Sequence, residues 1–284
     1  MRVRQTAGVL LASPWILTFL AFWLFPLIYS LFLSLTDYRL LQPTYSWVGF
    51  QNFINLFSDT IFLNSLKNTF IFVFGAIPVT TIISLIMALL LDKSFRGRTL
   101  FRSGFFMPSI TSMVVIALIF TNLYSRGGYI FLLAQMAGFS PPGNGFLLSN
   151  KTALLSIMAM DVWMSVGYYM LLFLAGLKSI PIELYEAADV AGAGRWRKFY
   201  SITLPLLKPV TLFIIVINTI KSFQVFIEIF VMTQGKYNSS SAVYFIYELG
   251  LNRFEFGYAS AAAYLLFMII AIFSFIQFKL MKQG

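Results

Sequence analysis

The chain has 284 residues, of which 59% are hydrophobic and 11% are charged, and its mean hydropathy is +0.83. Globular proteins carry about 25% charged residues, so this composition excludes a water-soluble surface and places most of the chain in a bilayer. The sequence contains no Cys and no His, which excludes disulfides, thiolate nucleophiles, Cys/His metal sites and histidine acid–base chemistry. The formal net charge is +10, and its meaning depends on where the basic residues lie.

Apolar runs of about 20 residues with few or no charges, the length that crosses the hydrocarbon core, predict six membrane-spanning helices. The six runs are residues 9–35, 69–91, 104–124, 152–177, 209–231 and 257–278. The first run follows Arg2 and Arg4 as a secretory signal would, but its length and the lack of a cleavage site favour a retained helix. Pro26 and Pro78 are expected to kink their helices. The uncharged run 127–150 is rich in Gly and Pro, so it predicts a loop with one short interfacial helix.

The distribution of Lys and Arg gives an orientation. With the N-terminus inside, thirteen basic residues fall on inner segments and six fall on outer loops. Because cytoplasmic segments carry the excess of Lys and Arg, both termini are predicted to be cytoplasmic. The same distribution explains the basic balance without a nucleic-acid partner. The fold class is therefore an all-α integral membrane protein with six transmembrane helices, forming one membrane domain over residues 1–284.

The inner segment 179–208, between the fourth and fifth predicted spans, has the pattern of two short helices. Pro181 suits the first position of a helix, and Glu183, Glu186 and Asp189 lie toward its N-terminal end, where the helix dipole favours anions. Gly192 can end this helix. A second short helix is predicted from Arg195 to Pro205.

Small side chains in this segment leave a surface that another protein can approach closely. They are Ala187, Ala188, Ala191, Gly192 and Ala193. Such a surface suits insertion into a groove on a partner. The alternative is an ordinary amphipathic loop helix on the membrane surface.

The spacing in this segment resembles the signature loop of bacterial ABC-importer permeases. Glu186-Ala-Ala is followed by three residues, Gly192, nine residues and Ile202-Thr-Leu-Pro205, with no mismatch to that signature. SLTDY at 34–38, VGFQNF at 48–53, FRGRTLFR at 95–102, WMSVG at 163–167 and FIEIFVMTQG at 226–235 look like landmarks of the sugar-permease branch. The likeness extends over nearly the whole chain.

The resemblance implies a mechanism and a set of partners. In that family the loop forms a coupling helix that docks on a cytoplasmic ATPase subunit, and closure of two ATPases moves two permease subunits from inward-open to outward-open. The coupling positions that carry over are Glu186, Ala187, Ala188, Gly192, Ile202, Leu204 and Pro205. The implied partners are a second permease subunit, two ATPase copies, an extracytoplasmic solute-binding protein and the bilayer of a bacterial cytoplasmic (inner) membrane.

This chain is not expected to be an enzyme or to bind a cofactor itself. It lacks the Gly-x-x-x-x-Gly-Lys-[Ser/Thr] phosphate loop. ATP and Mg are therefore assigned to the partner ATPase.

Three ionisable residues lie within predicted spans: Asp161, Lys221 and Glu228. A charge at mid-bilayer costs at least about 2.5 kcal/mol, so such a residue normally faces a cavity, a partner or other protein. At 1.5 Å per residue, Asp161 lies about 15 Å below the outer end of its span and Lys221 about 18 Å above the inner end of its own. These depths permit an ion pair, which would either neutralise the two charges structurally or border a translocation cavity.

The candidate pathway residues are Asp161, Trp163, Asn218, Lys221, Ser222, Gln224 and Glu228. A carbohydrate, the solute that the resemblance implies, needs a few directed hydrogen bonds and flat apolar faces. In a continuous helix Lys221, Gln224 and Glu228 share one face, and Ser222 lies about 100° away. Lys221 and Glu228 would then stand about 10.5 Å apart along the axis, too far for a direct pair. Trp163 is either a stacking face for a sugar or a packing residue.

Three alternatives remain at this point: an ABC importer for a non-sugar solute, a secondary transporter or channel, and an intramembrane enzyme. The enzyme would have to work with carboxylates such as Asp161 and Glu228, and no known motif frames either. The secondary transporter would have no use for the inner loop 179–208.

Overall fold

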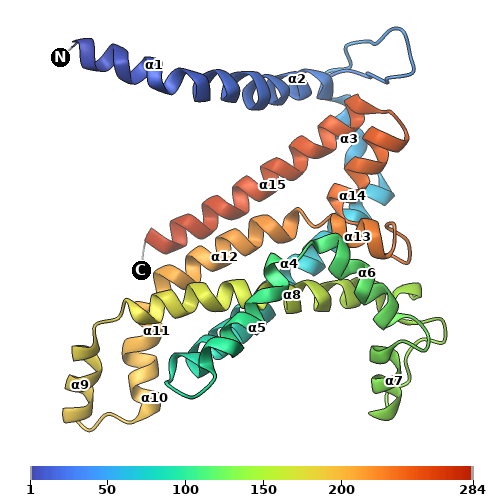
Figure 1. Ribbon diagram of the computed structural model, residues 1–284. Helices are drawn as coiled ribbons and strands as arrows, with labels where there is room; N and C mark the ends of the chain where they lie inside the picture. Colours follow the sequence, from blue (N-terminus) through green and yellow to red (C-terminus); the bar gives the residue numbers. More distant parts are fainter. Residues whose placement is uncertain (1, 283–284) are drawn as a thin grey trace. The chain divides into compact units, whose positions relative to one another are not determined.

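The computed structural model describes residues 2–282, and every regular element within them is a helix (Figure 1). The chain forms two compact units, each built from two stretches of sequence. Unit 1 comprises residues 1–63 and 245–268, and unit 2 comprises residues 64–244 and 269–284. Helix α4 (Thr60–Asp92) and helix α15 (Phe256–Lys282) each begin in unit 1 and continue into unit 2.

Unit 1 contains the N-terminal helix and the loop that follows it. Its elements are α1 (Arg2–Phe19), a π-helical turn (Leu20–Leu24), α2 (Phe25–Ser34), α3 (Gln51–Leu56), a second π-helical turn (Glu248–Asn252) and the start of α15. The loop after α2 is joined to the start of α15 by two backbone hydrogen bonds, from Leu40 N–H to Phe254 O (3.0 Å) and from Gly257 N–H to Tyr38 O (2.9 Å). Asn52 Nδ2 donates to the carbonyls of Ser34 (2.9 Å) and Thr36 (2.8 Å). These bonds satisfy backbone groups that the loop would otherwise leave open.

Unit 2 holds the remaining helices around α8 (Ala153–Lys178). They are α4, α5 (Arg98–Ile110), α6 (Met113–Tyr124), α7 (Tyr129–Met136), α9 (Ile182–Val190), α10 (Arg195–Lys198), α11 (Leu204–Leu206), α12 (Lys208–Phe223), α13 (Ile227–Met232) and α14 (Ala242–Tyr247), whose last residues reach unit 1. Seventeen of the 26 residues of α8 are buried. A helix that is apolar on all sides is expected at the centre of a bundle, and two apolar clusters pack along α8, one with α4, α6 and α13 and one with α4 and α12.

Helix α5 packs directly along α8, and Gly167 makes this approach possible (Figure 1). A Cβ at Gly167 would lie 1.8 Å from the carbonyl oxygen of Phe105. The two backbones therefore touch at a point where only glycine has room, as is common between membrane helices.

Four helices are long and apolar enough to cross a membrane: Leu11–Ser34, Thr60–Asp92, Ala153–Lys178 and Phe256–Leu280. Two bent pairs would bring the total to six within the described residues, namely Arg98–Ile110 with Met113–Tyr124 (98°) and Arg195–Leu206 with Lys208–Phe223 (59°). The run 127–150, predicted to be a loop with one short helix, contains the short helix α7 as expected. The run 104–124, predicted to be one helix, is divided between α5 and α6.

The prediction of a continuous third helix over 104–124 is wrong. The chain is extended at Thr111 (ψ 151°) and Ser112 (ψ 126°), between α5 and α6. Pro108 in the last turn of α5 has no N–H to donate. At the end of α5 the Thr111 N–H donates to the carbonyl of Pro108 (3.2 Å), and Thr111 Oγ1 donates to the carbonyl of Met107 (2.9 Å).

The prediction of a continuous fifth helix over 209–231 is also wrong. Helix α12 ends at Phe223 and α13 begins at Ile227, with Phe226 at φ −144° and ψ −58° between them. Lys221 and Glu228 therefore do not share one helix face, and the separation calculated from a continuous helix does not apply to them. Ser241 Oγ donates to the carbonyl of Val225 (2.7 Å), which stabilises the break from a distant part of the chain.

Candidate functional site

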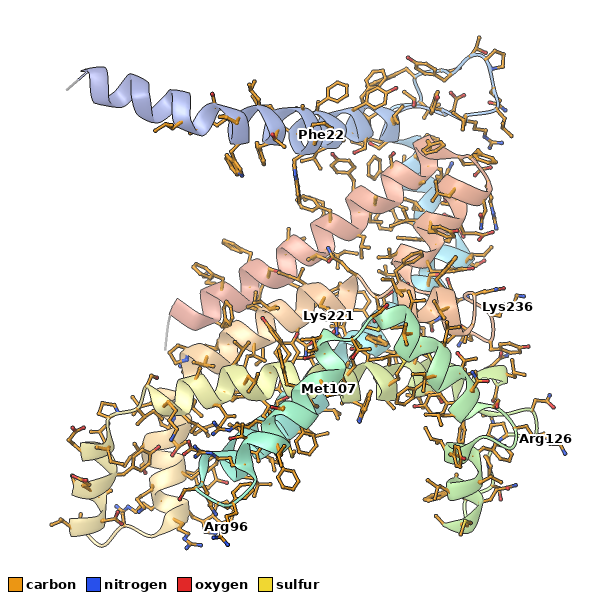
Figure 2. All side chains as sticks on the ribbon, viewed as in Figure 1. Phe22, Arg96, Met107, Arg126, Lys221 and Lys236 are labelled. Carbon is orange, nitrogen blue, oxygen red and sulfur yellow. The ribbon has the colours of Figure 1, made fainter. Side chains whose placement is uncertain are left out.

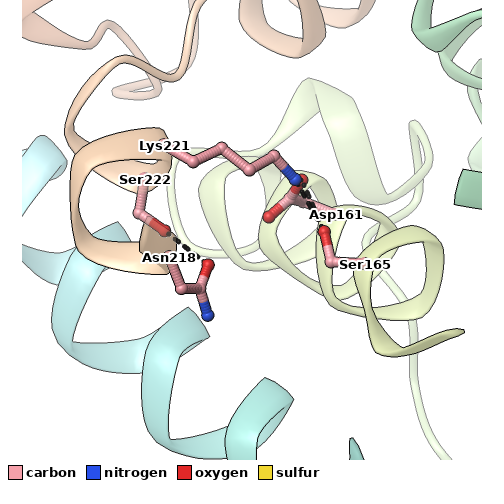
Figure 3. Close-up of polar contacts among 5 residues, drawn as sticks. All are labelled: Asp161, Ser165, Asn218, Lys221 and Ser222. Carbon is pink, nitrogen blue, oxygen red and sulfur yellow. Dashed lines mark hydrogen bonds and ion pairs between the residues drawn. The ribbon is translucent and has the colours of Figure 1, made fainter. Parts of the chain in front are cut away.

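Lys221, in the last turn of α12, forms an ion pair with Asp161 of α8 (Figure 3). Its Nζ lies 2.7 Å from Asp161 Oδ1. The ion pair that the predicted membrane depths of Asp161 and Lys221 permitted is thus present, and each charge has a partner. The two side chains differ in exposure, at 3% for Asp161 and 40% for Lys221. The pair therefore has a sealed carboxylate end and an accessible ammonium end.

Ser165 completes this polar cluster and was not among the predicted site residues. Its Oγ accepts a hydrogen bond from Lys221 Nζ at 2.6 Å and lies 3.4 Å from Asp161 Oδ1. Ser165 stands four residues after Asp161 on the same helix, so the two share a face. The four-residue spacing between Asp161 and Ser165 is the sequence feature from which Ser165 could have been predicted as a site residue.

Asn218 and Ser222 lie beside the ion pair on α12 but form a separate contact. Ser222 Oγ donates to Asn218 Oδ1 at 3.3 Å, and both residues are buried (Figure 3). The Asn218 side chain points away from the Asp161–Lys221 pair. Of these two predicted pathway residues, only Ser222 reaches the polar cavity described next.

A cavity of about 720 Å³ lies beside the break between α12 and α13. Its polar wall brings together five of the seven predicted pathway residues: Asp161, Lys221, Ser222, Gln224 and Glu228. Its apolar wall is formed by Phe72, Met113, Ile217, Ile220, Val225, Phe226, Ile227 and Val243. This combination of a few polar groups and a mostly apolar wall is typical of a small-molecule site.

The two helix breaks shape this cavity. Met113, the first residue of α6, and the segment Gln224–Phe226 both line it. Gln224 is exposed, and Glu228 in the first turn of α13 is 5% exposed. Both residues line the same cavity as Lys221, although the sequence analysis had placed all three on one continuous helix that the structure does not have.

Trp163 is placed elsewhere. It is 51% exposed, its ring centroid lies 5.3 Å from that of Phe120, and it lines a second, apolar cavity of about 770 Å³ between α4, α5 and α8. Trp163 is two residues from Asp161, a step of about 200° around a helix, so the two side chains point to different sides of α8. The structure thus separates Trp163 from the polar cavity.

The predicted two-helix segment 179–208 forms a helical hairpin, which we define as α9 to α11 (residues 182–206). Tyr185 OH lies 2.9 Å from Thr203 Oγ1, and Lys198 Nζ lies 2.6 Å from Asp189 Oδ1, so polar contacts hold its two arms together. Pro181 precedes the first helical residue, and Gly192 follows the end of α9 with φ +71°, as its predicted role in ending the helix requires. The hairpin arms run side by side (Figure 1).

The residues of the signature spacing lie on the surface of the hairpin within this chain. None of the nine residues of α9 is buried. Glu186, Ala187, Gly192, Leu204 and Pro205 are exposed, and Ala188 and Ile202 are partly exposed. Val190 and Trp196 expose 92% and 74% of their surfaces. An apolar surface of this kind is typical of a protein or membrane contact.

These features define a polytopic membrane protein with a charged polar cavity between broken helices and an exposed helical hairpin. Residues 80–283, more than half of the chain, match the family described as the binding-protein-dependent transport system inner membrane component. The chain belongs to this family. It is the permease subunit of an ABC transporter, as the resemblance of its loop 186–205 implied.

Curated relatives match over almost their full length. The chain is 34% identical to the probable ABC transporter permease protein YesP of Bacillus subtilis, covering 98% of this chain and 91% of the relative. It is 34% identical to the arabinooligosaccharides transport system permease protein AraP of Bacillus subtilis (98% and 89% covered). It is 32% identical to the lactose transport system permease protein LacF of Rhizobium radiobacter (99% and 96% covered).

A solved structure shares the fold. A bacterial ABC transporter involved in the import of the acidic polysaccharide alginate aligns with a TM-score of 0.86 at 24% identity, covering 99% of this chain and 96% of that chain. At this identity the likeness concerns the fold alone.

Proposed function

We propose that this permease forms half of the translocation pathway for a carbohydrate or polyol-like solute, and that the cavity beside the α12–α13 break is part of that pathway. The observation that carries the proposal is the meeting of Asp161, Lys221, Ser222, Gln224 and Glu228 on one cavity wall. Polar groups at membrane depth are expensive unless they serve a cavity or a partner. Their collection around one space is what a hydroxyl-rich solute needs in order to cross the bilayer.

The proposed substrate class is supported by the relatives. The names of AraP and LacF specify arabinooligosaccharides and lactose, and another relative is the multiple sugar-binding transport system permease protein MsmF of Streptococcus mutans. Because identity to these proteins is 31–34% over most of the chain, a carbohydrate is the solute we assign to this permease.

We also assign the hairpin a coupling role, with Glu186, Ala187, Ala188, Gly192, Ile202, Leu204 and Pro205 facing an ATPase subunit. The exposure of α9 supports this role, because none of its residues is buried within this chain and its surface is therefore open to a partner. Two ATPase copies, a second permease subunit and an extracytoplasmic binding protein complete the proposed assembly. A solved alginate ABC transporter, crystallised with a pentasaccharide-bound periplasmic protein, is similar in fold.

The proposed topology has six spans, with α5 and α6 together as the third and α12 and α13 together as the fifth, and with both termini on the cytoplasmic side of a bacterial inner membrane. The excess of basic residues on the inner segments supports this orientation. The hairpin then lies in the cytoplasm, where ATP is available to a partner.

Gly192 provides the sharpest test of the coupling role. A Cβ at this position would meet no other atom within 4 Å, so a side chain there is not blocked by this chain itself. In the reconstituted transporter, Gly192→Glu is expected to lower substrate-driven ATP hydrolysis and uptake at least about ten-fold, because a charged side chain desolvated at a docking surface costs several kcal/mol. Membrane insertion should be unchanged.

Matched substitutions separate docking from backbone strain. Gly192→Asn tolerates the left-handed conformation and adds no charge, so it should retain more activity than Gly192→Glu. Gly194→Glu introduces the same charge at a position with φ −67°, where no strain arises. Normal uptake by Gly192→Glu would rule out the assignment of the hairpin to the ATPase contact.

A further inference from the structure

Lys221 is the most accessible charged group on the wall of the polar cavity. The other ionisable residues that the structure describes on this wall are Asp161 and Glu228. The Lys221 side chain is 40% exposed, whereas Asp161 and Glu228 are 3% and 5% exposed. A solute that enters this space therefore meets the ammonium group before it meets either carboxyl group.

The ammonium group of Lys221 keeps one hydrogen-bond donor for a further partner. It has three N–H donors. Within the described part of the chain, Nζ donates one to Asp161 Oδ1 at 2.7 Å and one to Ser165 Oγ at 2.6 Å (Figure 3). Both acceptors belong to α8, so the tetrahedral geometry of the nitrogen directs the remaining N–H away from them.

Asp161 and Ser165 hold this ammonium group in one place. They are four residues apart on α8, on the same face of the helix, and both contact the same Nζ. Because Asp161 is sealed and Lys221 is accessible, the ion pair presents its positive end to the cavity and its negative end to the protein interior.

We propose that Lys221 is the residue that contacts the solute in this cavity, so that the cavity accepts sugars through their oxygens, carboxylate oxygens included, and rejects sugars that carry a protonated amine. This inference rests on the proposed function, since it takes the cavity as the pathway. A hydroxyl or carboxylate oxygen can accept the remaining N–H of Lys221. A protonated amine has only donors, and it places a second positive charge beside the ammonium group. Lys221 is thus assigned as a specificity-determining residue, and Asp161 and Ser165 are assigned as positioning residues.

The absence of cysteine from the sequence allows a direct measurement of the charge that a solute meets. Gln224, which is exposed and lines the cavity, is replaced by cysteine in the assembled transporter. The rate of reaction is then measured with an anionic and a cationic methanethiosulfonate reagent of similar size. Asn144→Cys, in an exposed part of the loop 127–150, reports the ratio of the two rates away from the cavity.

The ratio of anionic to cationic rates at Gln224→Cys should exceed the ratio at Asn144→Cys. Adding Asp161→Asn, which keeps the ammonium group and removes its counter-charge, should raise the ratio further. Adding Lys221→Gln to that variant leaves no unpaired buried carboxylate. It should lower the ratio at least about five-fold, the effect of one unit charge about 8 Å away in water on two reagents of opposite sign. Lys236→Gln, the same substitution at an exposed residue outside this wall, should leave the ratio unchanged.

The solute class is tested on the same cysteine with an uncharged reagent, methyl methanethiosulfonate. Glucose, glucuronate and glucosamine serve as probes, with glucosamine measured below neutral pH so that its amine is protonated. Glucose and glucuronate should slow the reaction at Gln224→Cys, and glucosamine should slow it less than glucose does. In the variant with both Asp161→Asn and Lys221→Gln, this difference between glucose and glucosamine should disappear.

Two different failures can be told apart. If modification of Gln224→Cys blocks sugar uptake but the anionic reagent has no advantage there, or if glucosamine protects as well as glucose, the assignment of Lys221 is overturned and the pathway stands. If modification of Gln224→Cys leaves sugar uptake intact, this cavity is not the pathway, and both proposals fail. The ratio in the Gln224→Cys variant alone tests which charge a solute meets, even where the variants of the ion pair do not assemble.

Discussion

The Asp161–Lys221 ion pair is unequally buried, and this predicts unequal effects of mutating its two members. Lys221→Gln leaves the Asp161 carboxylate, only 3% exposed, without its cation. Breaking a buried ion pair from one side costs about 3–5 kcal/mol. Asp161→Asn instead leaves a Lys221 side chain that is 40% exposed and keeps its bond to Ser165, so its cost should be closer to the 1 kcal/mol or so of an exposed pair.

The double variant Asp161→Asn with Lys221→Gln restores neutrality and allows an amide–amide hydrogen bond. Its cost should therefore be about 3 kcal/mol smaller than the sum of the two single costs. For a chain of this size, 1 kcal/mol corresponds to about 2–4 °C in Tm. Lys221→Gln should thus lower the apparent midpoint of thermal unfolding by roughly 10 °C, and the double variant should recover most of that loss.

The assay is thermal unfolding of the purified transporter in detergent at one fixed scan rate, since unfolding of such assemblies is commonly irreversible. Lys236→Gln is the matched control, because Lys236 lies exposed on the loop after α13 while Lys221 lies inside the bundle (Figure 2). Strict additivity of the two single variants, or a larger loss for Asp161→Asn than for Lys221→Gln, would refute this account of the pair.

Two further predictions concern packing and topology. Gly167→Ala should lower Tm by roughly 5–10 °C, because the added Cβ would collide with the Phe105 carbonyl. Gly104→Ala on the adjoining helix is the control and should have little effect on Tm, since a Cβ there meets no atom within 4 Å. Equal Tm values for the two variants would contradict the close contact. Single cysteines at Tyr185 and Asn144 should be labelled from the inside and the outside of intact cells, respectively, and labelling of position 185 from outside would overturn the topology.

The parts that the sequence predicted well are those that local chemistry determines. Uncharged length located the four continuous helices to within a few residues of their observed ends, except where α4 begins nine residues before the predicted run. Gly192 ends α9 because its backbone conformation, with φ +71°, is one that glycine adopts readily. The ion pair was also accessible to sequence reasoning, since two charges of opposite sign at a comparable membrane depth attract each other.

The breaks within the third and fifth predicted spans were not predicted, because the spans were assigned from apolar length, which carries no information on backbone continuity. Gln224-Val-Phe226 contains neither Gly nor Pro. The carbonyl of Val225 is instead satisfied by Ser241, sixteen residues away, and this contact exists only once the chain has folded. Helical geometry alone predicts that Trp163 and Asp161 point to different sides of α8. Which of these sides faces the polar cavity depends on where α12 packs.

The position of the two breaks is an argument for the pathway that does not depend on the charged residues. Non-helical backbone at membrane depth is tolerated only where it is buried in protein or lines a water-filled space. Both breaks are at the same cavity, one through Met113 and the other through the segment Gln224–Phe226. If this cavity were sealed and functionless, a continuous α12 extending to Met232 would satisfy more backbone bonds at lower cost. The two breaks at one cavity therefore support the proposed pathway, since discontinuous spans line the binding sites of other transporters.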